Sequence, residues 1–312
     1  MATDRRFTGG ATGRSADETG RPGDPSAGPD GPDRPAEEGV GSVRVDGRRL
    51  AYATYGDPDG RPVLVHHGSP GSRLVGQLLD GAARERGLRL VAPDRPGFGR
   101  STHDPDRTIP DWPGDAAAVL DALGIERASV VGFSGGGPFA LAVAAAHPDR
   151  VEQVVLASAS GPPSASTPSP ADPAVRVLRA IARRAPVLLG PLLGLQRRLL
   201  DRQEPAAVAG LFTDRDLPPA VAEAVADDVR AAFRDGAAGP ARESRLLVRP
   251  WGIDLGAVTA TTTVVCGTDD RNVPPDAAEA LVDALPSATL VRQEGDDHLG
   301  PLLDAGALLD RV

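Results

Sequence analysis

Short apolar segments alternate with segments of helical periodicity from residue 42 onwards. Strand-length segments that are almost wholly apolar predict strands buried on both faces, which is typical of parallel sheets. Six segments have this character: residues 62–66, 88–92, 128–133, 151–157, 262–266 and 288–291. Helical patterns at residues 109–123 and 135–147 separate some of them. This order predicts an α/β fold with a mostly parallel, doubly wound sheet.

Two further strands are predicted ahead of these six. Residues 43–45 and 50–55 flank the dipeptide Asp46-Gly47, which is typical of hairpin turns. The two strands should therefore pair with each other, and the complete sheet should have eight strands.

Residues 1–41 have a different composition. They consist mostly of Gly, Pro, Asp, Ser and Thr, and only Met1, Phe7 and Val40 carry sizeable apolar side chains. Such a segment buries too little apolar surface to offset the entropy lost on ordering. We therefore expect residues 1–41 to form a disordered tail.

A helical insertion interrupts the alternation at residues 161–251. Its first helical stretch is amphipathic, with apolar residues on one face and arginines elsewhere. The insertion is either a layer packed on the sheet or a lid over a substrate pocket, and we favour the lid because it follows a strand end. Residues 42–160 and 252–312 then form the catalytic core. Three or four helices are expected in the insertion, near residues 175–184, 187–200, 219–233 and 242–248.

Composition argues against several classes of function. The net charge of −9 disfavours a nucleic-acid partner, because phosphate binding needs a basic face. The one cysteine, Cys266, cannot form an internal disulfide. The longest apolar run, residues 186–195, is about half as long as a membrane span. We expect a cytoplasmic protein with a small-molecule substrate, no membrane span, no cofactor and no metal; the sequence predicts no oligomeric state.

Ser134 lies where a predicted strand meets a predicted helix, within the pattern Gly-x-Ser-x-Gly. It is either a nucleophile or a small residue in a glycine-rich turn. A nucleophile at such a strand-to-helix turn sits on a strained backbone. Side chains at Gly132 and Gly136 would clash with the neighbouring strand and helix. This context favours the nucleophile.

A serine nucleophile needs a base, and the chain holds only five histidines. His66 and His67 end a strand before Ser134, and His103 lies in a charged loop. His147 ends the helix that follows Ser134, which places it roughly 20 Å away. His298 alone follows the last strand, which makes it the candidate base.

The acid that orients the base is expected after the strand at residues 262–266. Asp269 and Asp270 both follow this strand, at the carboxyl end where open α/β sheets bind ligands. Both could also be ordinary turn residues. An order of nucleophile, acid and base along the chain is that of α/β-hydrolases.

With these residues in place, the sequence resembles the α/β-hydrolase superfamily, in particular its lidded serine hydrolases. The resemblance extends from about residue 43 to the C-terminus and implies the α/β-hydrolase fold with an inserted helical cap. It rests on four motifs in the order of the family: residues 67–71 (HGSPG), 94–101 (DRPGFGRS), 267–274 (GTDDRNVP) and 295–299 (GDDHL).

The resemblance implies roles for particular residues. The Gly-x-x-Asp-x-x-Val-Pro motif assigns the acid to Asp270 rather than Asp269. Ser134 would then attack a carbonyl carbon, and His298 would take its proton.

The same resemblance implies an oxyanion hole. Its donors would be the backbone N–H groups of Ser69 and Gly135. His67 and Gly68 would support the loop that carries Ser69, while Asp94 and Arg95 are expected to shape their own loop.

A serine nucleophile argues against the branches of the superfamily that use aspartate at this position. Hydrolysis of a small or medium apolar carboxylic ester is expected, because the lid is rich in Leu, Val and Ala and predicts an apolar pocket. Proline iminopeptidase-like cleavage, carbon–carbon bond hydrolysis, lactone hydrolysis and cofactor-free perhydrolase or haloperoxidase chemistry use the same triad. A receptor that binds a ligand with little turnover remains an alternative of another class.

Overall fold

The computed structural model describes residues 39–163 and 170–312. The predicted tail comprises residues 1–41, of which residues 1–38 lie outside the described residues. Its last residues, Val40 and Gly41, belong to strand β1 (Val40–Val45) and pair with Ala53 and Tyr52. The boundary was predicted two residues too late because β2 (Arg48–Gly56) is long enough to pair with both.

Eight strands form one sheet in the order β1-β2-β4-β3-β5-β6-β7-β8. Strand β1 pairs antiparallel with β2, and β2 pairs antiparallel with β4, whereas all other neighbours are parallel. The predicted hairpin turn is present, and both Asp46 and Gly47 have positive φ. The predicted eight-stranded, mostly parallel sheet is confirmed. Its remaining strands are β3 (Arg61–His66), β4 (Leu88–Pro93), β5 (Ala128–Phe133), β6 (Val151–Ala157), β7 (Thr261–Gly267) and β8 (Ala288–Gln293).

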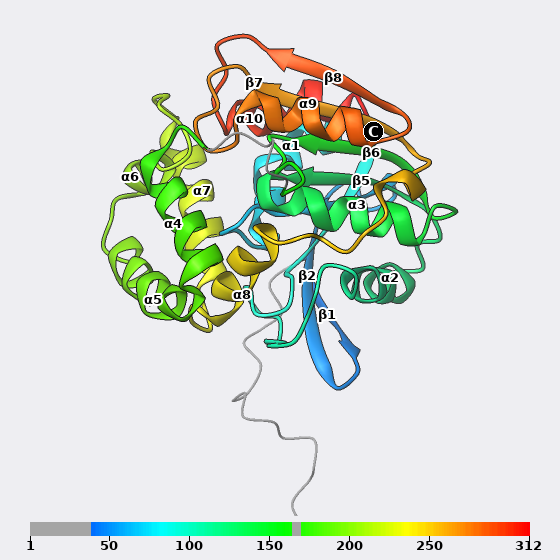
Figure 1. The fold of residues 1–312 in the computed structure, drawn as a ribbon. Helices are drawn as coiled ribbons and strands as arrows, with labels where there is room; N and C mark the ends of the chain where they lie inside the picture. The colour runs from blue at the N-terminus through cyan, green and yellow to red at the C-terminus, as the bar shows by residue number, and fades with distance from the viewer. Residues whose placement is uncertain (1–38, 164–169) are drawn as a thin grey trace, which may run out of the picture. The chain divides into compact units, whose positions relative to one another are not determined.

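Helices cover both faces of the sheet (Figure 1). Successive strand residues point to opposite faces, so Leu64 packs in one cluster and its neighbours Val63 and Val65 pack in the other. The first cluster lies under α2 (Trp112–Ala122), α3 (Gly137–Ala146) and α9 (Pro275–Ala284). The second lies under η1 (Arg73–Leu78), α1 (Asp80–Glu85), α10 (Gly300–Leu303) and α11 (Ala305–Leu309).

The helices between β6 and β7 form the cap predicted from the sequence. They pack around a separate apolar cluster that includes Phe98, Leu189 and Phe233. Helix α6 was not predicted, because a five-residue segment shows too little periodicity. The cap consists of α4 (Pro173–Arg184), η3 (Pro186–Leu188), α5 (Leu189–Leu200), α6 (Pro205–Ala209), α7 (Pro219–Ala232) and α8 (Ala238–Leu247). None of the helices in the described segments has the length and apolarity needed to cross a bilayer.

Candidate active site

The structure brings Ser134, His298 and Asp270 together, although up to 164 residues separate them along the chain. His298 Nε2 lies 2.9 Å from Ser134 Oγ, and His298 Nδ1 lies 2.8 Å from Asp270 Oδ2. A carboxylate can only accept a hydrogen bond, so Nδ1–H donates to Asp270 and Nε2 is free to accept from the serine hydroxyl. His298 and Asp270 are both buried. The three side chains form one continuous hydrogen-bonded chain.

Ser134 occupies a strained turn between β5 and α3. Its φ is 50°, in the left-handed region that a residue with a Cβ rarely adopts. The flanking glycines allow the turn: a Cβ on Gly132 would lie 2.8 Å from Ala140 Cβ, and one on Gly136 would lie 2.5 Å from the His67 carbonyl oxygen. Both contacts are too short for a side chain, as the sequence predicted. The turn places Ser134 directly after the carboxyl end of β5.

Asp270 lies on the loop after β7, and both of its carboxylate oxygens have partners. Oδ1 accepts from the backbone N–H groups of Asn272 (2.9 Å) and Val273 (2.8 Å), which leaves Oδ2 for His298. Asp269 is exposed. The structure therefore places Asp270, and not Asp269, against the histidine.

Ser69 and Gly135 lie side by side next to Ser134. A Cβ on Gly135 would be 2.7 Å from Ser69 Cβ and 3.3 Å from Ser69 N. The Ser69 N–H has no acceptor within residues 39–163 and 170–312. Gly68 packs against Phe133, and a Cβ at Gly68 would lie 3.6 Å from Ser134 Cβ. The loop that carries Ser69 is therefore in contact with the strained turn.

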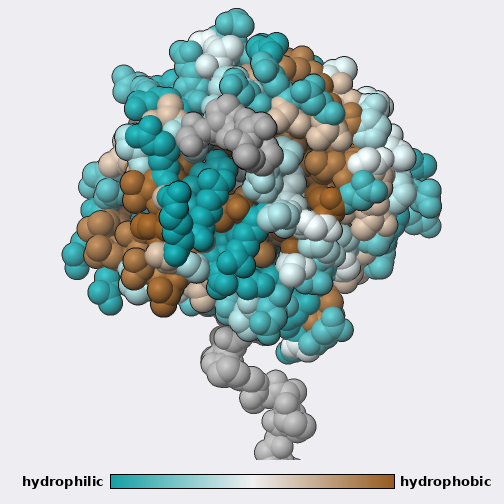
Figure 2. Space-filling view, viewed as in Figure 1, coloured by the Kyte–Doolittle hydropathy of each residue, from teal (hydrophilic) through white to brown (hydrophobic). Residues whose placement is uncertain are grey.

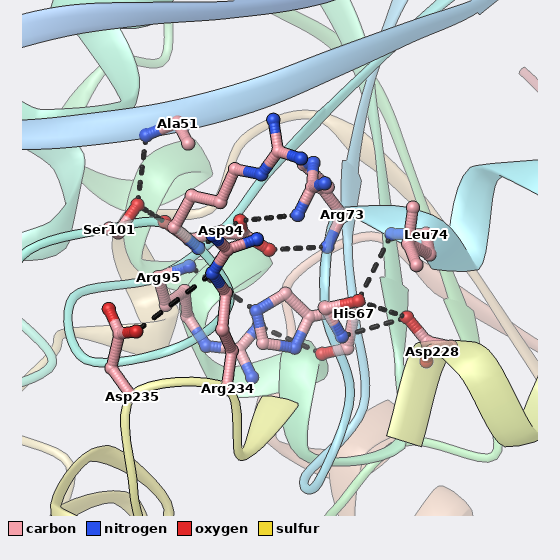
Figure 3. A network of polar contacts seen from close by, with 12 residues as sticks. Ala51, His67, Arg73, Leu74, Asp94, Arg95, Ser101, Asp228, Arg234 and Asp235 are labelled. Atoms are coloured by element: carbon pink, nitrogen blue, oxygen red, sulfur yellow. Dashed lines mark hydrogen bonds and ion pairs between the residues drawn. The ribbon is translucent and has the colours of Figure 1, made fainter. Parts of the chain in front are cut away.

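Arg95 donates hydrogen bonds to the loop that carries Ser69. Its Nη1 donates to the His67 carbonyl at 2.8 Å and its Nη2 donates to the Gly68 carbonyl at 3.0 Å. Figure 3 shows Arg95 beside His67. The guanidinium also stacks 4.5 Å above the ring of Phe139. The expected loop-shaping role of Arg95 thus extends to the neighbouring loop, which carries Ser69.

Glu243 on α8 of the cap neutralises Arg95. Arg95 Nε donates to Glu243 Oε2 at 2.8 Å, and Arg107 Nη2 donates to the same oxygen at 2.9 Å. All three side chains are buried. Burial alone would raise the pKa of the Glu243 carboxyl, but the attraction of Arg95 and Arg107 outweighs it and lowers the pKa below its usual range. Glu243 therefore stays ionised and joins the cap to the core.

Replacing Glu243 with glutamine should destabilise the protein by about 3–5 kcal/mol, because the variant leaves two buried guanidinium groups without an anion. Chemical denaturation gives the free energy of unfolding. Glu279→Gln is the matched control, since Glu279 pairs with Arg292 at the exposed surface and should change stability by less than about 1 kcal/mol. Equal effects of the two variants would contradict this role for Glu243.

His66 and His67 are not candidates for the base. Burial and the charge of Arg95 lower the pKa of His66 to about 3 and hold the pKa of His67 well below its ordinary value. The His67 ring contacts two backbone groups: Nδ1 donates to the Gly68 carbonyl at 2.7 Å, and Nε2 accepts from the Arg95 N–H at 3.3 Å. His67 is thus a neutral brace of the loop.

A second buried contact joins the cap to the same region. Asp228 on α7 accepts from the Ser72 N–H at 2.8 Å and from Ser72 Oγ at 2.9 Å. Beside it, Asp94 accepts from the Arg73 N–H at 2.7 Å and pairs with the Arg73 guanidinium at 3.1 Å. Figure 3 shows Asp228 next to the Arg73–Asp94 pair. Burial raises the pKa of Asp228 to about 7.

Asp228 should make stability depend on pH. Its pKa of about 7 in the folded protein exceeds the ordinary value of about 4, so between these pH values the folded state holds a proton that the unfolded state has lost. The stabilisation is complete below about pH 4 and is lost as pH rises through about 7. Relative to Asp228→Asn, which stays neutral, the wild type should lose roughly 2–4 kcal/mol over this range. Urea unfolding at several pH values measures the difference, and a difference that is constant with pH would contradict the shift.

A small cavity of about 40 Å³ opens beside His298. It has room for a few water molecules. Leu211 and Phe212 of the cap line one part, and the ring of Phe212 stacks 6.4 Å from that of His298. The lining is otherwise more polar than the apolar pocket predicted from the lid composition, because loop residues rather than the cap helices supply it: Asp172, Thr213, Asp214, Asp269, Arg271, Asn272 and Asp297.

Sequence reasoning found the three residues of the hydrogen-bonded chain and the loop residues around them. It did not find Glu243, Arg107 or Asp228. Glu243 contacts Arg95, which lies 148 residues away along the chain, and no local sequence pattern predicts such a pairing. A single acidic residue on the apolar side of a predicted helix was the one available signal.

Comparisons with known proteins agree with this architecture. The model of the α/β-hydrolase fold family matches residues 61–305. A 2-hydroxymuconate semialdehyde hydrolase of Pseudomonas putida is 31% identical over 268 residues, which cover 78% of this chain and 84% of that protein. A non-heme chloroperoxidase of Streptomyces lividans is 33% identical over 281 residues, which cover 83% and 93% of the two chains.

The fold also matches solved structures. The esterase RhEst1 from Rhodococcus sp. ECU1013 superimposes with a TM-score of 0.63 and 25% identity, over 87% of this chain and 96% of that one. These relatives have names that describe different reactions. The match of the family model over most of the sequence shows that the chain belongs to the α/β-hydrolase family of enzymes.

Proposed function

We propose that the protein is a serine hydrolase that attacks a carbonyl substrate through an acyl-enzyme. The observation that carries the proposal is the hydrogen-bonded chain from Asp270 through His298 to Ser134. A serine hydroxyl is a weak nucleophile without an adjacent base, and the base needs a third group to fix its tautomer. In this proposal Ser134 is the nucleophile, His298 the base and Asp270 the third group. They follow the carboxyl ends of β5, β8 and β7.

In the first half-reaction, Ser134 Oγ attacks the carbonyl carbon while its proton passes to His298 Nε2. Asp270 stabilises the imidazolium that results. When the tetrahedral intermediate collapses, the bond to the leaving group breaks and His298 delivers the proton to that group. Water then attacks the carbonyl carbon of the acyl-enzyme and gives a proton to His298. The bond to Ser134 Oγ breaks, and His298 passes the proton to this oxygen, which releases the acid and restores the serine hydroxyl.

The developing oxyanion is stabilised by the backbone N–H groups of Gly135 and Ser69 in this proposal. Their adjacency beside Ser134 supports it, and one such donor is worth roughly 3 kcal/mol in other hydrolases. Arg95 acts as a positioning residue, because it fixes the carbonyls of His67 and Gly68 just ahead of Ser69.

The proposed substrate is a small or medium apolar carboxylic ester. Two apolar side chains lie near the site: Phe133 packs 5.3 Å from the His298 ring, and Leu247 of the cap would lie 3.1 Å from a Cβ on Gly135. The cavity beside His298 is small, and we expect cap side chains to move when such an ester binds.

Carbon–carbon bond hydrolysis of an acidic diketone is a second candidate. The relative named 2-hydroxymuconate semialdehyde hydrolase supports this candidate. The cavity beside His298 does not add to it, because Arg271, Asn272 and Thr213 share its lining with Asp172, Asp214, Asp269 and Asp297.

A fluorophosphonate probe followed by a substrate panel tests the proposal. The probe should label Ser134, as located by peptide mass spectrometry, and short p-nitrophenyl esters should be hydrolysed with a burst of p-nitrophenol. Parallel assays with anilides, lactones and acidic diketones decide between ester and carbon–carbon hydrolysis by the ratio of kcat/KM values. A folded protein that is not labelled would instead favour a ligand receptor.

A further inference from the structure

Helix α5 is apolar on two separate faces. Leu189, Leu193 and Leu200 are buried in the cap. A second row lies at helical spacings of four, three and four residues, which places its members on one side of the helix. This row is between 38% and 55% exposed and consists of Leu188, Leu192, Leu195 and Leu199. Packing within the cap therefore uses one apolar face and leaves the other in solvent.

The exposed row belongs to a larger apolar patch. Val187 of η3, which directly precedes α5, is 81% exposed, and Val177 on α4 is 57% exposed. Among the described residues, Leu211 is the only large hydrophobic residue that is comparably exposed elsewhere. Figure 2 shows apolar side chains gathered at the lower left, where Figure 1 places α5. Contiguous exposed apolar surface of this kind marks an interaction site.

The same two helices are strongly basic, although the whole chain carries a net charge of −9. Residues 173–202 contain a single acidic residue, Asp201, and seven arginines. No acidic side chain of the described residues forms an ion pair with any of the seven, which are Arg176, Arg179, Arg183, Arg184, Arg197, Arg198 and Arg202.

Like charges also crowd one another on α4. Burial, and next to it the charge of Arg183, lower the pKa of the Arg179 guanidinium. Arg183 and Arg184 are exposed and directly precede the apolar residues of η3 and α5. An anionic surface in contact with this region would neutralise the arginines and cover the leucines at the same time.

We propose that the α4–α5 face of the cap binds a membrane surface rich in anionic lipid. This face is defined by the exposed leucine row with Val177, Val187 and the five exposed arginines Arg176, Arg183, Arg184, Arg198 and Arg202. Helices with exposed leucine and arginine side chains lie in the interface of such bilayers, where alkyl groups enter the acyl boundary and cations contact the headgroups. The acidic remainder of the chain would orient the cap towards the lipid.

Other occupants of this face fit the observations less well. A second copy of the chain would meet the face through a two-fold axis, which would set unpaired arginines against arginines. Residues 1–38 contain only Met1 and Phe7 as large apolar residues, too few to cover the leucines. Nucleic acid would suit the arginines but would leave the apolar row exposed.

Vesicle sedimentation with the full-length protein tests this proposal. The wild type should sediment with vesicles of phosphatidylglycerol and phosphatidylcholine but not with pure phosphatidylcholine. Raising the ionic strength from about 0.1 M to about 1 M shortens the Debye screening length from about 10 Å to about 3 Å. This weakens the attraction to the lipid and should release most of the protein.

Two variants separate the charged and apolar contributions. Arg183→Gln/Arg184→Gln should weaken binding about 30-fold, and Leu195→Gln/Leu199→Gln should weaken it at least about tenfold. The matched control is Arg44→Gln/Arg127→Gln, which removes the same charge from exposed positions outside the cap and should bind like the wild type. Thermal unfolding verifies that each variant is folded.

Three results would overturn the proposal. The first is wild-type protein that does not sediment with anionic vesicles at low salt. The second is a control variant that loses as much affinity as Arg183→Gln/Arg184→Gln, because the effect would then be one of net charge alone. The third is a wild-type dimer, seen by sedimentation velocity, that Leu195→Gln/Leu199→Gln converts to a monomer, since the face would then bind a second copy. None of these readouts depends on hydrolytic activity.

Discussion

Replacing Ser134 with alanine is expected to lower kcat for ester hydrolysis by about a millionfold, because the variant has no group to form the acyl-enzyme. Fluorophosphonate labelling should disappear as well. The matched control is Ser42→Ala on β1, an exposed serine outside the site, which should retain full activity. Since alanine has the same Cβ as serine, the strained turn at this position should be retained, and thermal unfolding checks that it is.

A second substitution sharpens this test. Members of a catalytic unit are not additive, so Ser134→Ala/His298→Ala should be little worse than Ser134→Ala alone. If Ser134→Ala kept more than about one per cent of wild-type kcat, the nucleophile would lie elsewhere. The acyl-enzyme mechanism would then be wrong.

The second large effect concerns the acid. Asp270→Asn should lower kcat by about ten-thousandfold, because of how the side chain is held. Its Oδ1 accepts from the N–H groups of Asn272 and Val273, so the amide of asparagine would keep its oxygen there and turn its NH₂ group towards His298. Nδ1 would then have to accept, and Nε2 would carry the proton and could not take one from Ser134.

Asp269→Asn is the control for this experiment, because it removes the same charge one residue away from an exposed side chain. Its kcat should stay within about a factor of three of the wild type, as surface charges outside direct contact have small effects. Rates are measured with the p-nitrophenyl ester that gives the highest kcat/KM. A large loss of kcat in Asp269→Asn and a small one in Asp270→Asn would show that the acid is Asp269 and that this proposal is wrong.

The parts of the fold that sequence predicts well are those with local causes. The buried strand β5 is apolar at nearly every position, and Gly132 and Gly136 are required by contacts within a few residues of Ser134 or with the adjoining strand. His298 could be selected because the chain contains so few histidines. Asp270 could be distinguished from Asp269 only through the resemblance of its loop to a family motif.

The parts that sequence does not predict depend on contacts across the chain. Glu243 neutralises Arg95 and Arg107 from another structural layer, and Asp228 caps a turn 156 residues away. Periodicity indicates that a helix has an apolar face but not which of two such faces will be covered. The lid's content of Leu, Val and Ala predicted an apolar pocket, whereas the cap places one row of leucines at α5 in solvent.

The burial of Glu243 against two arginines has a consequence for exchanging caps among relatives. A cap transplanted from another enzyme of this fold would leave Arg95 and Arg107 desolvated unless it brings a carboxylate to the same place. The loop that carries Ser69 would lose its support with it. Chimeras should therefore keep this acidic position together with Asp228, whose carboxylate accepts from Ser72, and substrate range can diversify through changes elsewhere in the cap.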